Sequence, residues 1–103
     1  MRDAQHIPVL LKEAITGLNI KPSGIYIDCT MGEAGHASEI LKRLTAGGHL
    51  YCFEQDLDVI PLGRDRLTKI GANFTIIPEN FVNLRTKMKE LGVGQVDGVL
   101  YDL

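Results

Sequence analysis

IYIDCTMGEAGH, residues 25–36, is the stretch of the chain that decides its fold. A short run of β-branched and aromatic residues ends in Asp28, passes through small residues and opens an amphipathic helix near His36. In a nucleotide-binding βαβ unit, the strand carries the chain to the edge of a sheet, and small residues let the backbone approach a ligand closely. The spacing Gly32-x-x-Gly35 fits this arrangement, although the same spacing follows apolar runs in many other proteins.

A second acidic residue strengthens this interpretation. Glu54 follows the apolar run LYCF at residues 50–53 and lies 22 residues after Gly32. In dinucleotide-binding folds, an acidic residue about 20 positions after the glycine-rich turn binds the ribose hydroxyls. The two features together predict a ligand site at the ends of two strands.

Length and composition indicate one globular domain. The chain has 103 residues, of which 45% are hydrophobic and 23% charged, and these fractions exclude a disordered or collagen-like protein. No apolar run approaches the ~20 residues that span a bilayer, and the first residues lack the apolar core of a signal peptide. We therefore expect a cytoplasmic protein without a membrane partner. Cys29 and Cys52 are expected to be free thiols. The net charge of −2 is too balanced for tight RNA binding by this chain alone.

Helical and strand-like segments alternate along the chain. Apolar residues at helical spacing predict helices at residues 9–18, 36–44, 58–70 and 81–91. Short apolar runs predict strands at residues 25–28, 50–54, 74–77 and 96–101. Asp58 is expected to cap the third helix, while Gly47-Gly48, Gly71 and Gly92 are expected to end the second, third and fourth helices.

This alternation predicts an α/β fold with helices on both faces of a parallel sheet, which makes three layers. Right-handed crossovers place the second and third strands successively on one side of the first. With the fourth strand on the other side, the strand order is 3-2-1-4, and a ligand crevice opens between the carboxyl ends of the first and fourth strands. The loop at residues 28–36 and Asp102 then form opposite walls of this crevice.

Motifs spread over the whole chain resemble those of one family. They are HIPVLLKEA at 6–14, GIYIDCT at 24–30, GEAGH at 32–36, EQD at 54–56, NF at 80–81 and VDGVLYDL at 96–103. Together they resemble the start of the bacterial ribosomal RNA small-subunit methyltransferase H (MraW) family. Its members transfer a methyl group from S-adenosylmethionine (SAM) to the N4 amine of a cytosine in 16S rRNA.

The resemblance implies a Rossmann-like class I methyltransferase fold, SAM as the cofactor and 16S rRNA of the small ribosomal subunit as the partner. The family's cofactor contacts fall here at Ala34, Gly35, His36, Glu54, Phe81 and Asp102, and Asp28 and Gly32 complete the expected set. Asp28 attracts the methionine ammonium, Glu54 accepts from the ribose hydroxyls, and Phe81 offers an apolar face to adenine.

Asp102 is the catalytic candidate. The lone pair of the cytosine amine is delocalised into the ring, so an acceptor that draws on the N4–H group assists methyl transfer. Other readings stay open from spacing alone: Phe81 begins an apolar stripe and fits a core position equally well, Asp28 can cap a turn, and His36 can lie on the surface. The histidines lack metal-ligand spacing, so no metal site is expected.

Four positions depart from the family's usual pattern. Cys29 and Ala34 stand where glycine is common, Glu33 stands where glycine or a basic residue is usual, and Glu54 replaces an aspartate. A Cβ at Ala34 disfavours a positive φ, and we expect it to add bulk beside the ligand and so to weaken cofactor binding.

Residues 1–103 are expected to be the N-terminal part of a SAM-binding methyltransferase domain, with the later strands and the RNA-recognition insertion absent. The isolated chain is then expected to be inactive and to form a homodimer through the exposed edge of its fourth strand. Two alternatives remain: an NAD-dependent Rossmann oxidoreductase, for which Glu54 serves equally well, and a truncated product without activity.

Overall fold

The computed structural model describes residues 19–101 of the chain. Its elements are, in order, β1 (Ile25–Asp28), α2 (Gly35–Arg43), β2 (His49–Phe53), α3 (Ile60–Thr68), β3 (Phe74–Ile77), the 3₁₀ helix η2 (Phe81–Asn83), α4 (Leu84–Glu90) and β4 (Gly98–Leu100). The helix predicted at residues 9–18 and Asp102 lie outside the described residues. Within the described part of the chain, no helix has the length and apolar character that crossing a membrane requires.

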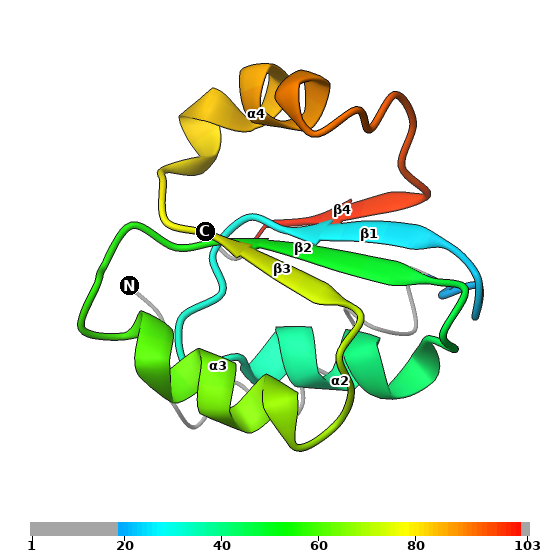
Figure 1. The fold of residues 1–103 in the computed structure, drawn as a ribbon, viewed down its shortest axis with the longest axis horizontal. Coiled ribbons are helices and arrows are strands. Elements are labelled where there is room, and N and C mark those ends of the chain that lie inside the picture. The colour runs from blue at the N-terminus through cyan, green and yellow to red at the C-terminus, as the bar shows by residue number, and fades with distance from the viewer. Residues whose placement is uncertain (1–18, 102–103) are drawn as a thin grey trace.

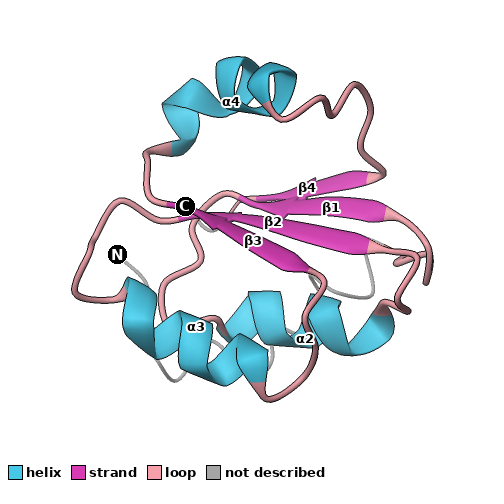
Figure 2. Cartoon of the chain, viewed as in Figure 1, coloured by secondary structure: helices cyan, strands magenta, loops and turns pink. Residues whose placement is uncertain are grey.

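The four strands form one parallel sheet in the order β3-β2-β1-β4, which confirms the predicted order. Tyr26 of β1 pairs with Leu50 of β2 on one side and with Gly98 of β4 on the other. Helices α2 and α3 cover one face of the sheet, and η2 and α4 lie over the other (Figures 1 and 2). The predicted three-layer α/β fold class is therefore confirmed.

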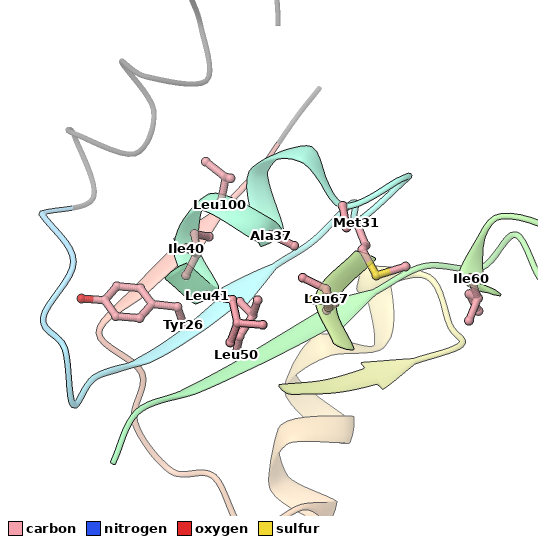
Figure 3. Close-up of a cluster of buried hydrophobic side chains, with 11 residues drawn as sticks. Tyr26, Met31, Ala37, Ile40, Leu41, Leu50, Ile60, Leu67 and Leu100 are labelled. Atoms are coloured by element: carbon pink, nitrogen blue, oxygen red, sulfur yellow. The ribbon is translucent and has the colours of Figure 1, made fainter. Parts of the chain in front are cut away.

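Side chains alternate between two hydrophobic clusters, one on each face of the sheet. On the side of α2 and α3, which we call the α2/α3 face, the cluster contains Tyr26, Met31, Ala34, Ala37, Ile40, Leu41, Leu50, Cys52, Ile60, Leu67 and Leu100. Figure 3 shows these side chains packed between the helices and the strands. Leu50 and Leu67 have no exposed surface, so this face is closed to solvent.

The opposite face, which we call the α4 face, is less completely covered by the part of the chain that the structure describes. Its buried cluster is smaller and consists of Ile27, Cys29, Phe53, Ile77 and Met88. A cavity of about 440 Å³ lies beside Ile27 and Met88 and is also bordered by Leu84, Val93 and Val96. This cavity therefore lies on a face of the sheet and not at the strand ends where the site was predicted.

Strand β4 is shorter than predicted, because a side chain replaces part of its ladder. The strand begins at Gly98 and ends at Leu100, whereas the apolar run predicted residues 96–101. The Asp97 carboxylate accepts a hydrogen bond of 2.8 Å from the Ile25 N–H, and the Asp97 N–H donates one of 2.7 Å to the Ile25 carbonyl. The Asp97 carboxylate thus accepts the hydrogen bond from Ile25 N–H that a strand carbonyl would otherwise accept.

The helix boundaries differ from the prediction where turns intervene. Helix α3 begins at Ile60, with Val59 before it in helical conformation and no side-chain cap, so the predicted capping role of Asp58 is wrong. Helix α2 ends at Arg43, before the Gly47-Gly48 pair, which belongs to the turn into β2. The predicted helix 81–91 begins with the 3₁₀ turn η2, because Asn80 caps Val82 N–H.

Candidate functional site

The predicted site residues come together where the strands end. Asp28 is the last residue of β1, and Gly32 and Ala34 lie in the loop that leads into α2. Glu54 follows β2 directly, and its carboxylate reaches this loop because β1 and β2 are adjacent and parallel. Phe81 follows β3 at the same edge of the sheet. The structure therefore gathers residues from three strand ends into one region.

The loop at residues 29–34 has a specific backbone conformation. The buried Asp28 carboxylate accepts a hydrogen bond of 3.0 Å from Thr30 N–H, which turns the chain directly after β1. Gly32 and Ala34 both have positive φ values, of 55° and 72°. Ala34 N–H donates to the Met31 carbonyl at 2.8 Å and closes the turn. The glycine at position 32 is needed for its φ, since nothing lies within 4 Å of a Cβ built there.

Ala34 combines a left-handed backbone conformation with a buried side chain. Its φ of 72° is the left-handed conformation that a Cβ disfavours. Its side chain, however, has no exposed surface and packs in the cluster of the α2/α3 face. The methyl group is therefore buried in the core of this face, and the expected weakening of cofactor binding stays a prediction.

Gly35 and His36 begin helix α2. The first i→i−4 bond of this helix runs from Ser38 N–H to the Ala34 carbonyl at 2.9 Å. The preceding N–H groups of the first turn therefore lie outside the intrahelical ladder, as at every helix N-terminus. Such a terminus favours anionic groups, including carboxylates.

The Glu54 carboxylate connects two loops. Oε1 accepts a hydrogen bond of 2.8 Å from Gly32 N–H, and Oε2 accepts one of 3.0 Å from Asp56 N–H. A carboxylate has about four acceptor positions, so each oxygen keeps capacity for a further donor. Glu54 can therefore organise the β1–α2 loop and accept from a diol at the same time.

A small cavity of about 70 Å³ lies at this edge of the sheet. Its lining residues come from the loops after β1, β2 and β3, and they are Cys29, Thr30, Phe53, Glu54, Gln55, Glu79, Asn80 and Phe81. The Thr30 hydroxyl is buried without a hydrogen-bond partner among the described residues, which the sequence analysis did not identify. In the sequence, only the position of Thr30, two residues after Asp28, could have indicated it. An unpaired buried hydroxyl beside a cavity is the kind of group that a ligand satisfies.

Two amide side chains join the loops on one side of this cavity. Asn80 donates from Nδ2 to Gln55 Oε1 at 3.2 Å, while its Oδ1 accepts from Val82 N–H at 2.9 Å. Both oxygen acceptors are therefore used within the protein. The remaining N–H groups of the amides are the ones that Gln55 and Asn80 can offer to a ligand.

Phe81 has an aromatic neighbour that the sequence analysis missed. The rings of Phe81 and Tyr101 meet edge to face, with centroids 5.4 Å apart and an interplanar angle of 79°. Phe81 also packs against the cluster of the α4 face. Phe81 therefore contributes to the core, as one of its two readings expected, and also lines the small cavity, while its contact to adenine stays a prediction.

The thiol beside this aromatic pair is held in its neutral form. Burial, together with the negative charge of Asp28, raises the pKa of Cys29 to about 11, against a smaller opposing effect of a hydrogen bond from Tyr101. Since the thiolate is the reactive species, Cys29 is a packing residue and not a nucleophile. Within residues 19–101, no three side chains of metal-binding type cluster together. Asp102, the predicted catalytic residue, lies outside the described residues.

Comparisons with known proteins agree in family and fold. The MraW methylase family matches residues 3–103. The chain is 54% identical over 99 residues to ribosomal RNA small subunit methyltransferase H of Mesoplasma florum, covering 96% of this chain and 32% of that protein. The corresponding protein of Mycoplasma mycoides gives the same identity and coverage, 54%, 96% and 32%. The chain thus spans about a third of the length of these relatives.

Solved structures resemble the fold at low sequence identity. TrmN of Thermus thermophilus aligns with a TM-score of 0.76 and 19% identity over 91% of this chain and 27% of that chain. A SAM-dependent O-methyltransferase of Thermotoga maritima aligns with a TM-score of 0.75 and 18% identity over 93% of this chain and 35% of that chain. The fold is therefore that of Rossmann-like SAM-dependent methyltransferases. Nothing in these comparisons supports the alternative of an NAD-dependent oxidoreductase.

Proposed function

The chain belongs to the MraW methylase family, and on this basis we propose that it is the SAM-binding N-terminal part of an rRNA methyltransferase. The reaction proposed is transfer of a methyl group to the N4 amine of a cytosine in 16S rRNA. The observation that carries the proposal is the position of Glu54, whose carboxylate lies at the end of β2 and is hydrogen bonded to the Gly32 N–H of the neighbouring loop.

The residues at the strand ends fit SAM in their chemistry. Glu54 offers carboxylate oxygens to the ribose hydroxyls, and the start of α2 at Gly35 and His36 suits the methionine carboxylate. The buried charge of Asp28 suits the methionine ammonium, and the same charge would repel a dinucleotide's pyrophosphate. Thr30 has a buried hydroxyl in need of a partner. When bound, SAM supplies a methyl group on a sulfonium centre, and in-line placement of donor and acceptor does most of the catalysis.

Phe81 and Asp102 are assigned the remaining roles in this proposal. Phe81 lines the small cavity and offers its ring to adenine. Asp102 directly follows the end of the described chain, and we assign it a contact to SAM or to the N4 amine of cytosine. An acceptor at that amine makes its lone pair more available as the new bond forms.

The partner in this proposal is 16S rRNA of the small ribosomal subunit, in the cytoplasm. The net charge of −2 gives this chain little electrostatic attraction for RNA phosphates. We therefore assign RNA recognition to the part of the longer relatives that residues 1–103 do not match. Purified 1–103 is expected to show no methyl transfer to 30S subunits, and robust labelling would contradict this division of roles.

The site assignment can be tested by titrating the chain with S-adenosylhomocysteine in a calorimeter. We expect weak binding that Glu54→Ala lowers by about 1–3 kcal/mol, since the ribose hydroxyls lose their acceptor. Asp56→Ala is the matched control, because among residues 19–101 the Asp56 side chain accepts only from Asp58 N–H in the next turn. No heat at millimolar ligand, or equal losses for the two variants, would contradict the site.

The outer edge of β4 bears on the oligomeric state proposed for residues 1–103. Within residues 19–101, β4 pairs only with β1, and its sequence Gly98-Val99-Leu100 has no charge or proline to discourage edge pairing. We propose that the isolated chain forms a homodimer through this edge. Sedimentation that shows a monomer at high concentration would contradict the proposal.

A further inference from the structure

Helix α3 touches the β1–α2 loop through a glycine in its interior. Gly63 is buried, although glycine is less favourable than alanine within a helix. A Cβ at this position would lie 2.6 Å from Met31 Cε, 3.1 Å from Met31 Sδ and 3.2 Å from the Gly32 carbonyl oxygen. The absence of a side chain therefore lets the helix approach the loop closely.

Met31 has little freedom to move away from the helix. Its side chain is 3% exposed and packs in the cluster of the α2/α3 face. Its N–H donates to the Phe53 carbonyl at 3.0 Å, and its carbonyl accepts from Ala34 N–H at 2.8 Å. A Cβ at Gly63 would therefore press on a side chain that the core encloses and, at 3.2 Å, on the Gly32 carbonyl oxygen of the loop itself.

A second residue of α3 reaches the same loop. Arg66 lies three residues after Gly63, on the same side of the helix, and its Nη1 donates to the Glu33 carbonyl at 3.3 Å. On the opposite side of the loop, Glu54 Oε1 accepts from Gly32 N–H at 2.8 Å. The loop at residues 31–34 is thus held between α3 and the end of β2.

We infer that Gly63 and Arg66 are positioning residues of the proposed SAM site. From α3, they fix how closely the loop at residues 31–34 lies to this helix. The inference rests on the proposed function, because it assumes that this loop and the start of α2 receive the methionine end of the ligand. Neither residue touches the ligand in this arrangement. Each acts through the loop backbone, by close packing at Gly63 and by a hydrogen bond at Arg66.

The inference predicts an effect on one end of the ligand more than on the other. A loop displaced by a few tenths of an ångström misdirects the N–H groups that precede Ser38 in α2, to which the proposed function assigns the methionine carboxylate. The proposed function assigns the adenosine end to Phe81 and to Glu54 Oε2, which accepts from Asp56 N–H and not from the loop at residues 31–34. The ratio of the two affinities therefore separates positioning from a general loss of stability.

The test compares Gly63→Ala with the unchanged chain in titrations with two ligands. S-adenosylhomocysteine contains the amino-acid end, and 5′-methylthioadenosine has the same adenosine and thioether without it. Gly63→Ala is expected to lower the affinity for S-adenosylhomocysteine about tenfold, as misplacement of binding groups does. The affinity for methylthioadenosine is expected to fall less than about twofold. Gly94→Ala is the control, since nothing lies within 4 Å of a Cβ at that exposed glycine. Equal binding by Gly63→Ala and the unchanged chain would overturn the inference.

A compensating substitution makes the mechanism specific. Leucine has no atom at the Cε position of methionine, so Met31→Leu removes the shortest of the three contacts at little cost in packing. The double variant Gly63→Ala with Met31→Leu is expected to recover most of the lost affinity for S-adenosylhomocysteine. Failure to recover any of it would overturn the assignment of the effect to this contact.

Arg66 gives an independent test if Gly63→Ala lowers the melting temperature so far that binding cannot be compared. Arg66→Ala removes the hydrogen bond to the Glu33 carbonyl and leaves the exposed surface of α3 otherwise unchanged. It is expected to lower the affinity for S-adenosylhomocysteine about threefold, the size of one modest hydrogen bond, without affecting the affinity for methylthioadenosine. Equal losses for both ligands would overturn the inference. If the unchanged chain binds neither ligand, the proposed function itself fails, which is a different result.

Discussion

The two faces of the sheet differ in how completely the helices between residues 19 and 101 cover them. On the α2/α3 face, two nine-residue helices close the surface, and Leu50 of β2 and Leu67 of α3 are fully buried. On the α4 face, a seven-residue helix covers the sheet and leaves a cavity of about 440 Å³ beside Ile27. Val99 of β4 is only half-buried there.

This difference indicates where the rigid part of the site is built. The loop at residues 31–34 is anchored on the α2/α3 face, through the buried side chains of Met31 and Ala34. Phe81, by contrast, belongs to the α4 face and begins a short 3₁₀ turn. We therefore expect the methionine end of the proposed site on the well-packed side of the sheet, and the adenine end on the loosely packed side. Local opening is expected to begin on the α4 face.

The largest expected effect compares the same substitution on the two faces. Leu67→Ala removes a fully buried side chain from α3 and is expected to lower the free energy of unfolding by about 3 kcal/mol. Leu84→Ala removes a half-buried side chain beside the cavity and is expected to cost about 1 kcal/mol. Urea denaturation measures both values. Equal losses would mean that α4 packs as tightly as α3.

The two thiols report on the opening of each face. Burial, with a further contribution from the Asp28 charge, raises the pKa of Cys52 on the α2/α3 face well above 9.0, and the pKa of Cys29 on the α4 face rises to about 11. At pH 8 both are neutral in the fold, so a thiol reagent reacts through opening. We expect Cys29 to be labelled about tenfold faster than Cys52. Equal rates would mean that both faces open together.

The raised pKa values of the two thiols also determine how the stability of the fold changes with pH. The folded state holds the thiols protonated, whereas the unfolded chain ionises near the ordinary pKa of 9.0. For Cys29 this contribution to stability is therefore complete below pH 9 and is lost as the pH rises through about 11. Cys29→Ala should make the decline between these pH values shallower in a series of urea titrations. If the loss of stability with pH is the same in Cys29→Ala, ionisation of Cys29 is not its cause.

The smallest expected effect concerns the strained alanine of the loop. Ala34→Gly relieves a left-handed conformation that costs about 1–2 kcal/mol, but it loses a buried methyl worth about 0.8 kcal/mol and adds the entropy cost of glycine. We expect a net change in unfolding free energy within about 0.5 kcal/mol. Ala37→Gly is the control, since Ala37 is equally buried in unstrained helix, and it should cost about 1.5 kcal/mol. Similar losses for both would show that the loop tolerates Ala34 without strain.

The strands and their order followed from the sequence because the pattern there is local. The runs at residues 25–28 and 74–77 form strands with the predicted bounds, and right-handed crossovers limit their order. The prediction was less accurate at β4, where the Asp97 side chain takes the place of a strand carbonyl. A hydrogen bond between residues 72 positions apart leaves no periodic signal in the sequence.

Within the site, the meeting of Asp28, Gly32 and Glu54 was predictable, since they follow the carboxyl ends of adjacent strands. The bond from Gly32 N–H to Glu54 was not, because it depends on the path of the loop and on one side-chain rotamer. Gly63 carried a weak signal as a glycine inside a helical segment, but the sequence does not say which segment it approaches. The role of Gly63 could be inferred only once the structure showed Met31 against it.

The pairing of β1 with two very distant segments has a consequence for how the chain folds. Tyr26 pairs with Leu50, 24 residues later, and with Gly98, 72 residues later. Closing the longer loop costs about 1 kcal/mol more in chain entropy, so β4 is expected to dock after β1 and β2 have paired. During synthesis at about 5–20 residues per second, the segment around Gly98 follows Leu50 by roughly 2–10 s. For that interval one side of β1 is an open, apolar template, and a chaperone or a neighbouring nascent chain can reach it before β4 does.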